Sequence, residues 1–172
     1  ATARSPTTRK AVTVGTLAST GGLAAGEDVQ SVARKLSAVD RCIEILSDSM
    51  AKLPSFVIDN RSRERLSHDI LYLLNVRPNE AMTPFVRKKV LETSRLEGGN
   101  GYDWIIRDPS TGLPKELIPV PWQLVQQWHD EIGRIWYDIT HPLTGELMRL
   151  PNEDVCHYKN ATRNGLKGIG TL

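Results

Sequence analysis

The spacing of apolar residues changes at Gly98–Gly99, and this change constrains the fold more than any other feature of the sequence. Before the two glycines, apolar side chains recur every three or four residues, as in an amphipathic helix. After them, Tyr102, Trp104 and Ile106 alternate with polar residues, as in a strand with one buried face. The sequence therefore predicts an α+β fold, with N-terminal helices followed by an antiparallel β meander.

A helix of about four turns is predicted between Ser37, a good N-cap residue, and Pro54, which ends it. A single apolar stripe with helical spacing runs along it and consists of Val39, Cys42, Ile43, Leu46, Met50 and Leu53. Such a stripe usually faces a protein core. The run 55–59 that follows is predicted to be a short strand.

Two further helices are predicted before the glycines. The first spans residues 66–74, with Ser67 as its cap. The second starts at Thr83-Pro84, a cap followed by proline, and stops at Gly98–Gly99, where glycine can adopt the left-handed conformation. The expected buried side of this last helix consists of Met82, Phe85, Val86, Val90 and Leu96.

Short strands separated by turn residues follow, and the predicted ones are 113–120, 124–128, 135–140, 147–150 and 155–158. Residues 1–28, rich in Ala, Thr, Ser and Gly, are predicted to form a flexible basic arm. Residues 29–158 form the expected α+β domain, and 159–172 an unstructured, Gly-rich basic segment. Because the chain stops on Gly170-Thr171-Leu172 with no closing element, we expect a further segment to follow it.

Composition places the chain among ordinary globular proteins. It has 172 residues, 40% hydrophobic and 24% charged, with a net charge of +2. Both ends are basic, which fits either two solvated tails or contact with a polyanion. Cys42 and Cys156 are not spaced like a disulfide framework, and free thiols are expected. No apolar run approaches the roughly 20 residues needed to cross a bilayer, so a soluble protein made in the cytosol is expected.

Catalytic and cofactor motifs are not evident. Residues 98–101 are glycine-rich, but they connect a predicted helix to a following strand. A phosphate-binding loop instead connects a strand to a following helix. Four candidate metal ligands, His129, His141, Cys156 and His157, lie in the second half of the sequence. Cys156 and His157 are adjacent, so on a strand they point to opposite faces, and no metal site is expected. No cofactor is predicted. A two-metal nuclease using Asp130-Glu131 and Glu153-Asp154 stays open as a minor alternative.

Four tryptophans, Trp104, Trp122, Trp128 and Trp136, fall on predicted strands. Strand aromatics can stack on exposed bases, but a binder of that kind also needs basic residues interleaved on the same face. Lys and Arg do not dominate the neighbours of these tryptophans. Packing in the core or at a subunit interface is therefore the favoured interpretation.

Seven segments, in order along the chain, resemble the portal proteins of tailed bacteriophages. The first helix, SAVDRCI running on to AKLP, is similar to the family's opening helix. His68-Asp69-Ile70 begins a segment like the family's H-P-L-x-x-L-L-x-x-x-P-N, although Asp69 stands where proline is usual. Gly101 likewise replaces alanine in G-N-A-Y. The remaining matching segments are Met82-Thr83-x-Phe85, Leu117–Val120, Leu150–His157 and Gly165–Ile169.

The resemblance implies a non-enzymatic, ring-forming subunit, usually dodecameric, at one vertex of the capsid. Such rings let double-stranded DNA pass during packaging and ejection, dock the terminase and later receive the tail connector. They belong to the virion and are assembled in the host cytoplasm, without a membrane partner. The matching region resembles the outer wing, and a wing fragment lacking the stem is expected to be largely monomeric.

The resemblance transfers no catalytic residue and no metal ligand, so the predictions concern surfaces. Exposed members of the set Trp122, Trp128 and Trp136 are hypothesised to pack between neighbouring subunits. The main alternative is a small nucleic-acid-binding module that uses the basic ends and the strand tryptophans. Mobility shifts with short DNA distinguish the two, because a binding module should show steep salt dependence.

Overall fold

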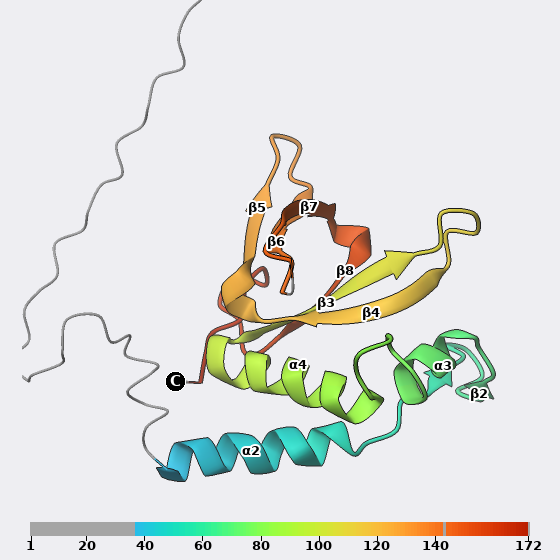
Figure 1. Cartoon of the computed structure of the whole chain (residues 1–172), viewed down its shortest axis with the longest axis horizontal. Coiled ribbons are helices and arrows are strands. Elements are labelled where there is room, and N and C mark those ends of the chain that lie inside the picture. Colours follow the sequence, from blue (N-terminus) through green and yellow to red (C-terminus); the bar gives the residue numbers. More distant parts are fainter. Residues whose placement is uncertain (1–36, 143, 172) are drawn as a thin grey trace, which may run out of the picture.

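The computed structural model, which describes residues 37–142 and 144–171, consists of a helical layer with a two-stranded sheet and two three-stranded sheets (Figure 1). The helical layer consists of α2 (Ser37–Ala51), β1 (Val57–Ile58), β2 (Arg65–Leu66), α3 (Ile70–Asn75) and α4 (Pro84–Gly98). α4 lies between α2 and the sheets, so α2 contacts the rest of the fold chiefly through α4. None of the helices in the described part of the chain has the length and apolar character needed to cross a bilayer.

Two three-stranded antiparallel sheets follow the helices, which confirms the predicted α+β class. The first has the order β4–β3–β8 and the second β5–β6–β7. Their bounds are β3 (Asn100–Arg107), β4 (Pro114–Val120), β5 (Val125–His129), β6 (Ile135–Thr140), β7 (Leu147–Pro151) and β8 (Val155–Lys159). Only β5–β7 form a meander; β8 returns to pair with β3. The single-turn 3-10 helices η1 (Trp122–Leu124) and η2 (Asn152–Asp154) carry the chain from one sheet to the other and back.

The main core lies between the two sheets. Tyr102, Tyr137 and Ile139 are at most 1% exposed, and Val120 and Val155 complete the cluster. The rings of Tyr102 and Tyr137 meet edge to face, with their centroids 5.7 Å apart. Because each strand alternates its side chains, the residues at every second position of β3 and β6 supply this core.

The predicted limits of α4 are confirmed. Thr83 is the N-cap, and its Oγ1 accepts a hydrogen bond from the Val86 amide at 3.3 Å. Pro84 occupies the first helical turn, where its missing N–H has no cost. Gly99 ends the helix with φ 75°, a conformation that strains any residue with a Cβ.

The predicted buried side of α4 is wrong. Phe85 and Val86 are exposed, and the residues that the structure buries are Arg87, Leu91, Ser94 and Glu97. Polar partners from later elements make this possible, because a buried polar group must be hydrogen-bonded. Ser94 Oγ, for example, donates to the Asn100 carbonyl at 2.9 Å and accepts from the Trp122 amide at 3.0 Å.

The predicted start of the second helix is also wrong. Leu66 lies in β2, where it pairs with Val57, so the chain is extended at this point and Ser67 caps no helix. α3 begins four residues later, after Asp69. The Ile70 amide donates to His68 Nδ1 at 3.1 Å and closes the turn that precedes the helix.

Residues 160–171, predicted to be unstructured, fold back along the end of α4. Asn100 holds them, since its Oδ1 accepts from the Gly168 amide at 2.7 Å and its Nδ2 donates to the Gly168 carbonyl at 3.1 Å. The Thr171 amide donates to the Leu96 carbonyl at 3.1 Å. A Cβ on Gly168 would overlap the Gly99 carbonyl oxygen, so the crossing requires glycine. The predicted arm, 1–28, and residues 29–36 of the predicted domain lie outside the described residues.

Candidate assembly surfaces

The candidate metal ligands of the sequence are scattered over the described part of the chain. No group of three or more His, Cys, Asp and Glu in 37–142 and 144–171 is placed to hold a metal ion. His129 is exposed at the end of β5, and His141 meets the Trp104 ring edge-on at 5.8 Å. Cys156 is a half-buried free thiol, and Cys42 is a free thiol exposed on α2.

His157 belongs to a hydrogen-bonded network between the sheets. Its Nε2 lies 2.9 Å from Asn100 Oδ1 and its Nδ1 lies 3.3 Å from the Tyr137 hydroxyl. Because Asn100 Oδ1 can only accept, Nε2 carries the proton and Nδ1 accepts from Tyr137. Burial, together with the nearby charges of Lys159 and Lys167, lowers the pKa of His157 to about 4. The ring is therefore neutral and structural at physiological pH.

Two of the predicted contact tryptophans form a ladder on the face of β5 and β6. Trp128 and Trp136 are opposite each other in the strand register and stack with ring centroids 6.1 Å apart. Arg149 from β7 lies over the Trp128 ring at 4.3 Å, and Arg134 lies 5.9 Å from the Trp136 ring. The structure therefore does interleave basic and aromatic side chains on one face.

Carboxylates neutralise both arginines of this ladder. Arg149 Nε donates to Asp138 Oδ1 at 2.7 Å, and Arg134 Nε donates to Asp130 Oδ2 at 2.7 Å. Desolvation opposes the effect, but hydrogen bonds from Arg134 and Trp136 lower the pKa of Asp130 to about 2. The ladder consequently offers aromatic surface without the excess positive charge that phosphate binding needs.

The prediction that Trp122 lies on a strand is wrong, because it begins the 3-10 helix η1; it lies apart from the ladder and packs within its own chain. A Cβ on Gly98 would overlap the Trp122 ring, so glycine allows the indole to lie against the end of α4. The ring also contacts the core cluster between the sheets. Of the three tryptophans hypothesised to make subunit contacts, the structure thus places Trp122 as an internal packing residue and brings Trp128 and Trp136 together.

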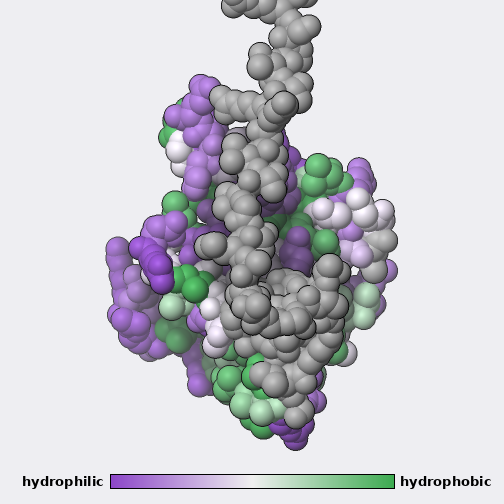
Figure 2. Space-filling view, turned by 90° about the vertical axis from the view of Figure 1, so that its left-hand side faces the viewer, coloured by the Kyte–Doolittle hydropathy of each residue, from purple (hydrophilic) through white to green (hydrophobic). Residues whose placement is uncertain are grey.

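The apolar stripe predicted on the first helix is largely exposed. α2 buries the small residues Ser47 and Ala51 against α4, while Leu46, Met50 and Leu53 stay 54%, 51% and 57% exposed. The apolar stripe of α2 therefore lies on one flank of the α2–α4 pair and does not face α4. Figure 2, which looks at the left-hand side of Figure 1, shows hydrophobic residues gathered at the lower edge, at the level of α2. Sequence periodicity located this surface but could not tell a core face from an outer one.

Two pockets with apolar walls lie along this flank. The first, about 330 Å³, is lined by residues of α2 together with Leu96 and Thr171. The second, about 350 Å³, lies at the end of α2 and is called the apolar pocket below. Its walls include Met50, Leu53, Pro54, Leu74, Lys88, Leu91 and Tyr158. Grooves of this kind, lined by the side chains of two helices, suit an apolar side chain from another molecule.

A buried ion pair supports the inner wall of the apolar pocket. Arg87, which reaches the pocket from α4, forms two hydrogen bonds with Asp103 of β3, and its Nε–Oδ1 distance is 3.2 Å. Both side chains are almost fully buried. Burial raises the pKa of the Asp103 carboxyl, and the guanidinium beside it opposes that rise. The pair joins the helical layer to the sheets and fixes the position of α4.

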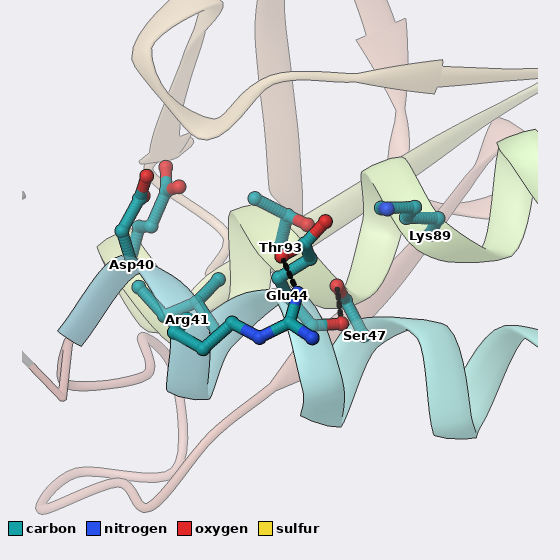
Figure 3. A pocket seen from close by; sticks show the side chains of 8 residues that line it. Asp40, Arg41, Glu44, Ser47, Lys89 and Thr93 are labelled. Atoms are coloured by element: carbon teal, nitrogen blue, oxygen red, sulfur yellow. Dashed lines mark hydrogen bonds and ion pairs between the residues drawn. The ribbon is translucent and has the colours of Figure 1, made fainter. Parts of the chain in front are cut away.

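The opposite flank of the α2–α4 pair is a charged cleft of about 480 Å³ (Figure 3). Arg41 and Glu44 form an ion pair of 2.5 Å, and Ser47 Oγ donates to the Glu44 carbonyl at 3.1 Å. Lys89 pairs with Asp48 at 2.6 Å on the same side. The two flanks therefore differ in kind, since one presents apolar pockets and the other presents charged side chains, among them the Arg41–Glu44 and Lys89–Asp48 ion pairs.

The family model described as phage portal protein matches residues 37–172. The chain belongs to the phage portal family. A search of curated proteins found no match. The stretch that matches includes every element of the described fold, so both flanks of the α2–α4 pair and the tryptophan ladder are features of a portal-family domain.

Solved structures with a similar fold come from portal and neck assemblies. A chain of the neck of an empty gene transfer agent particle is 23% identical, with a TM-score of 0.66 over 83% of this chain and 40% of that one. A chain of a native gene transfer agent virion is 21% identical, with a TM-score of 0.64 over 85% of this chain and 39% of that one. An HK97-family phage portal protein from Corynebacterium diphtheriae is 21% identical, with a TM-score of 0.50 over 76% of this chain and 39% of that one. The chain thus spans about two fifths of the length of these structures.

Proposed function

We propose that the chain is part of a subunit of a portal ring, through which DNA is packaged into a phage capsid or a related particle and later ejected. The observation that carries this proposal is the portal-family match across residues 37–172. The fold likeness to neck chains supports it, because those particles are described with C6 and C12 symmetry.

The distribution of surfaces is also what a ring needs. Subunits related by rotation contact one another head to tail, so each must present two different surfaces to its two neighbours. The apolar flank of α2–α4 and the sheets on the far side of α4 are two such surfaces. A helix that leaves its apolar stripe exposed is normally covered by other protein.

The partners of the whole assembly follow from the same proposal. We assign the domain a structural role without turnover, in the virion and, during assembly, in the host cytoplasm. Its partners would be other copies of itself in a ring of about twelve, the terminase, the capsid, the tail connector and the DNA in the channel. The neutralised arginines of the tryptophan ladder argue against an independent nucleic-acid-binding module on that face.

Ring formation is the experiment that tests the proposal. Sedimentation velocity of the intact polypeptide should give closed oligomers of defined mass, and negative-stain microscopy should show rings with an axial opening. Short duplex DNA should shift weakly, with a shallow salt dependence. Monomers at every concentration, combined with tight and steeply salt-dependent DNA binding, would contradict the portal assignment and favour the binding module.

A further inference from the structure

The tip of the β5–β6 hairpin holds an isoleucine out in solvent. Ile132 is 80% exposed, more than any other large hydrophobic residue in the described part of the chain. Figure 1 shows this tip projecting away from the helical layer. An isoleucine at such a position loses the free energy of burial unless another surface covers it.

The turn that carries Ile132 is firmly fixed. Asp130 Oδ1 accepts hydrogen bonds from the Ile132 amide at 3.0 Å and the Arg134 amide at 2.8 Å. The Gly133 amide donates to the Asp130 carbonyl at 3.0 Å, and its φ of 86° requires glycine. The isoleucine is therefore presented in one defined position, and little conformational entropy would be lost when it binds.

Glu131 adds a negative charge directly beside this apolar tip. It is exposed and takes part in none of the ion pairs formed among the described residues. The tip therefore combines an apolar side chain with a carboxylate. Leu113, the exposed leucine of the β3–β4 turn, is placed differently, since it lies at the base of its turn, where its carbonyl accepts from the Asp108 amide at 2.9 Å.

The apolar pocket offers the complementary combination. Its walls are mainly apolar, and Lys88 on its rim is the one lining cation for which the described residues supply no carboxylate, since Arg87 and Arg95 have acidic partners. Within 37–142 and 144–171, the hydrogen bond of Lys88 Nζ goes to a neutral acceptor, the Leu53 carbonyl, at 2.6 Å. Burial and the charge of Arg87 lower the pKa of Lys88, so an added carboxylate at this rim would relieve an uncompensated cation.

We propose that Ile132 of one copy enters the apolar pocket of the next copy and that Glu131 pairs there with Lys88. This inference rests on the proposed ring. The tip points away from the helical layer of its own chain, so a second copy must supply the pocket. Because tip and pocket are different surfaces, the contact is head to tail and repeats around a rotation axis, whereas a contact between like surfaces would close as a dimer.

Paired cysteines test the contact directly. In a Cys42→Ser background of the intact polypeptide, Ile132→Cys combined with Leu53→Cys should give a ladder of covalent oligomers on mild oxidation. The matched control is Leu113→Cys with Leu53→Cys, which places a thiol at an exposed position of the β3–β4 turn. We expect at least tenfold less cross-linking in the control. Equal yields in the two variants would overturn the proposal.

Charge exchange gives a second, independent test. Glu131→Lys and Lys88→Glu should each weaken self-association about tenfold in sedimentation velocity, and the double variant should recover most of the loss because it restores opposite charges. Ile132→Glu should weaken it further, and Leu147→Glu, at the opposite end of the same sheet, should not. Circular dichroism of each variant checks that these exposed substitutions leave the fold intact.

The outcomes separate this inference from the proposed function. If the wild type forms rings and the charge and tip variants form them equally well, the contact is wrong and the ring stands. If Leu147→Glu disrupts assembly and Ile132→Glu does not, the docking tip has been assigned to the wrong turn. If the wild type forms no oligomer and no covalent ladder, both the ring and the contact are wrong.

Discussion

The helical layer and the sheets treat their apolar residues in opposite ways. The sheets bury Tyr102, Tyr137 and Ile139 almost completely between them, and their stacked tryptophans are covered by arginines on the same face. In the helical layer, Leu46 and Met50 are more than half exposed although they lie on the most regular apolar stripe of the sequence. A regular stripe thus shows that a surface is to be buried, but not whether the same chain or another molecule buries it.

The Arg87–Asp103 pair is an almost fully buried link between these regions, and breaking it should have the largest effect. Arg87→Met leaves the Asp103 carboxylate buried without a counter-charge, which typically costs about 3–5 kcal/mol. Urea denaturation of the isolated domain measures the change. The control is the double variant Arg87→Met with Asp103→Leu, which should recover most of the loss because apolar replacements of buried pairs are often neutral. A single-variant loss below about 1 kcal/mol would show that the carboxylate reaches water.

Matched truncations in the two regions test the comparison itself. Ile139→Ala, at a fully buried position between the sheets, should lower the free energy of unfolding by about 2–5 kcal/mol. Leu46→Ala removes a similar volume from the exposed stripe of α2 and should change it by about 0.5 kcal/mol or less. Both are measured by urea denaturation of the monomeric protein. Similar losses at the two sites would mean that the stripe of α2 is buried within the monomer after all.

Local signals in the sequence were sufficient for much of the fold. The start of α4 at Thr83-Pro84 and its end at Gly99 were both predicted, because each signal depends only on residues within one helical turn of that end. The alternation of apolar and polar residues predicted the positions of the later strands, and the predicted bounds of β6 match the observed ones. Long-range pairing was not accessible in this way, and β8 was therefore expected at the end of a meander and not beside β3.

The buried face of α4 and the assembly surfaces needed information from distant residues. Arg87 looks like a solvated residue until Asp103, sixteen positions later, is placed opposite it. Residues 160–171 looked unstructured because Gly168 is held by Asn100, 68 positions away. The tryptophan ladder likewise depends on the register that sets Trp128 opposite Trp136 and on an arginine from a third strand. Apolar periodicity in one sequence contains none of these pairings.

Acid should distinguish the two regions by a smaller amount, through His157 between the sheets. Its pKa in the folded protein, about 4, lies below the ordinary value of 6.5, so the unfolded chain binds the proton more readily. The stability associated with the neutral ring is complete above pH 6.5 and is lost as the pH falls from 6.5 towards 4. The full shift of the pKa corresponds to about 3 kcal/mol, and because the ring is only partly buried we expect a loss of stability of about 1 kcal/mol by pH 5.

Urea denaturation at pH 7 and pH 5 measures this loss against His157→Gln, which keeps a hydrogen-bonding side chain but cannot titrate. The carboxylates are the same in both proteins, so their contribution cancels and the wild type should lose more stability than the variant. Parallel losses would mean that His157 is protonated as easily in the folded protein as in the unfolded chain, and that the interior between the sheets is open to water.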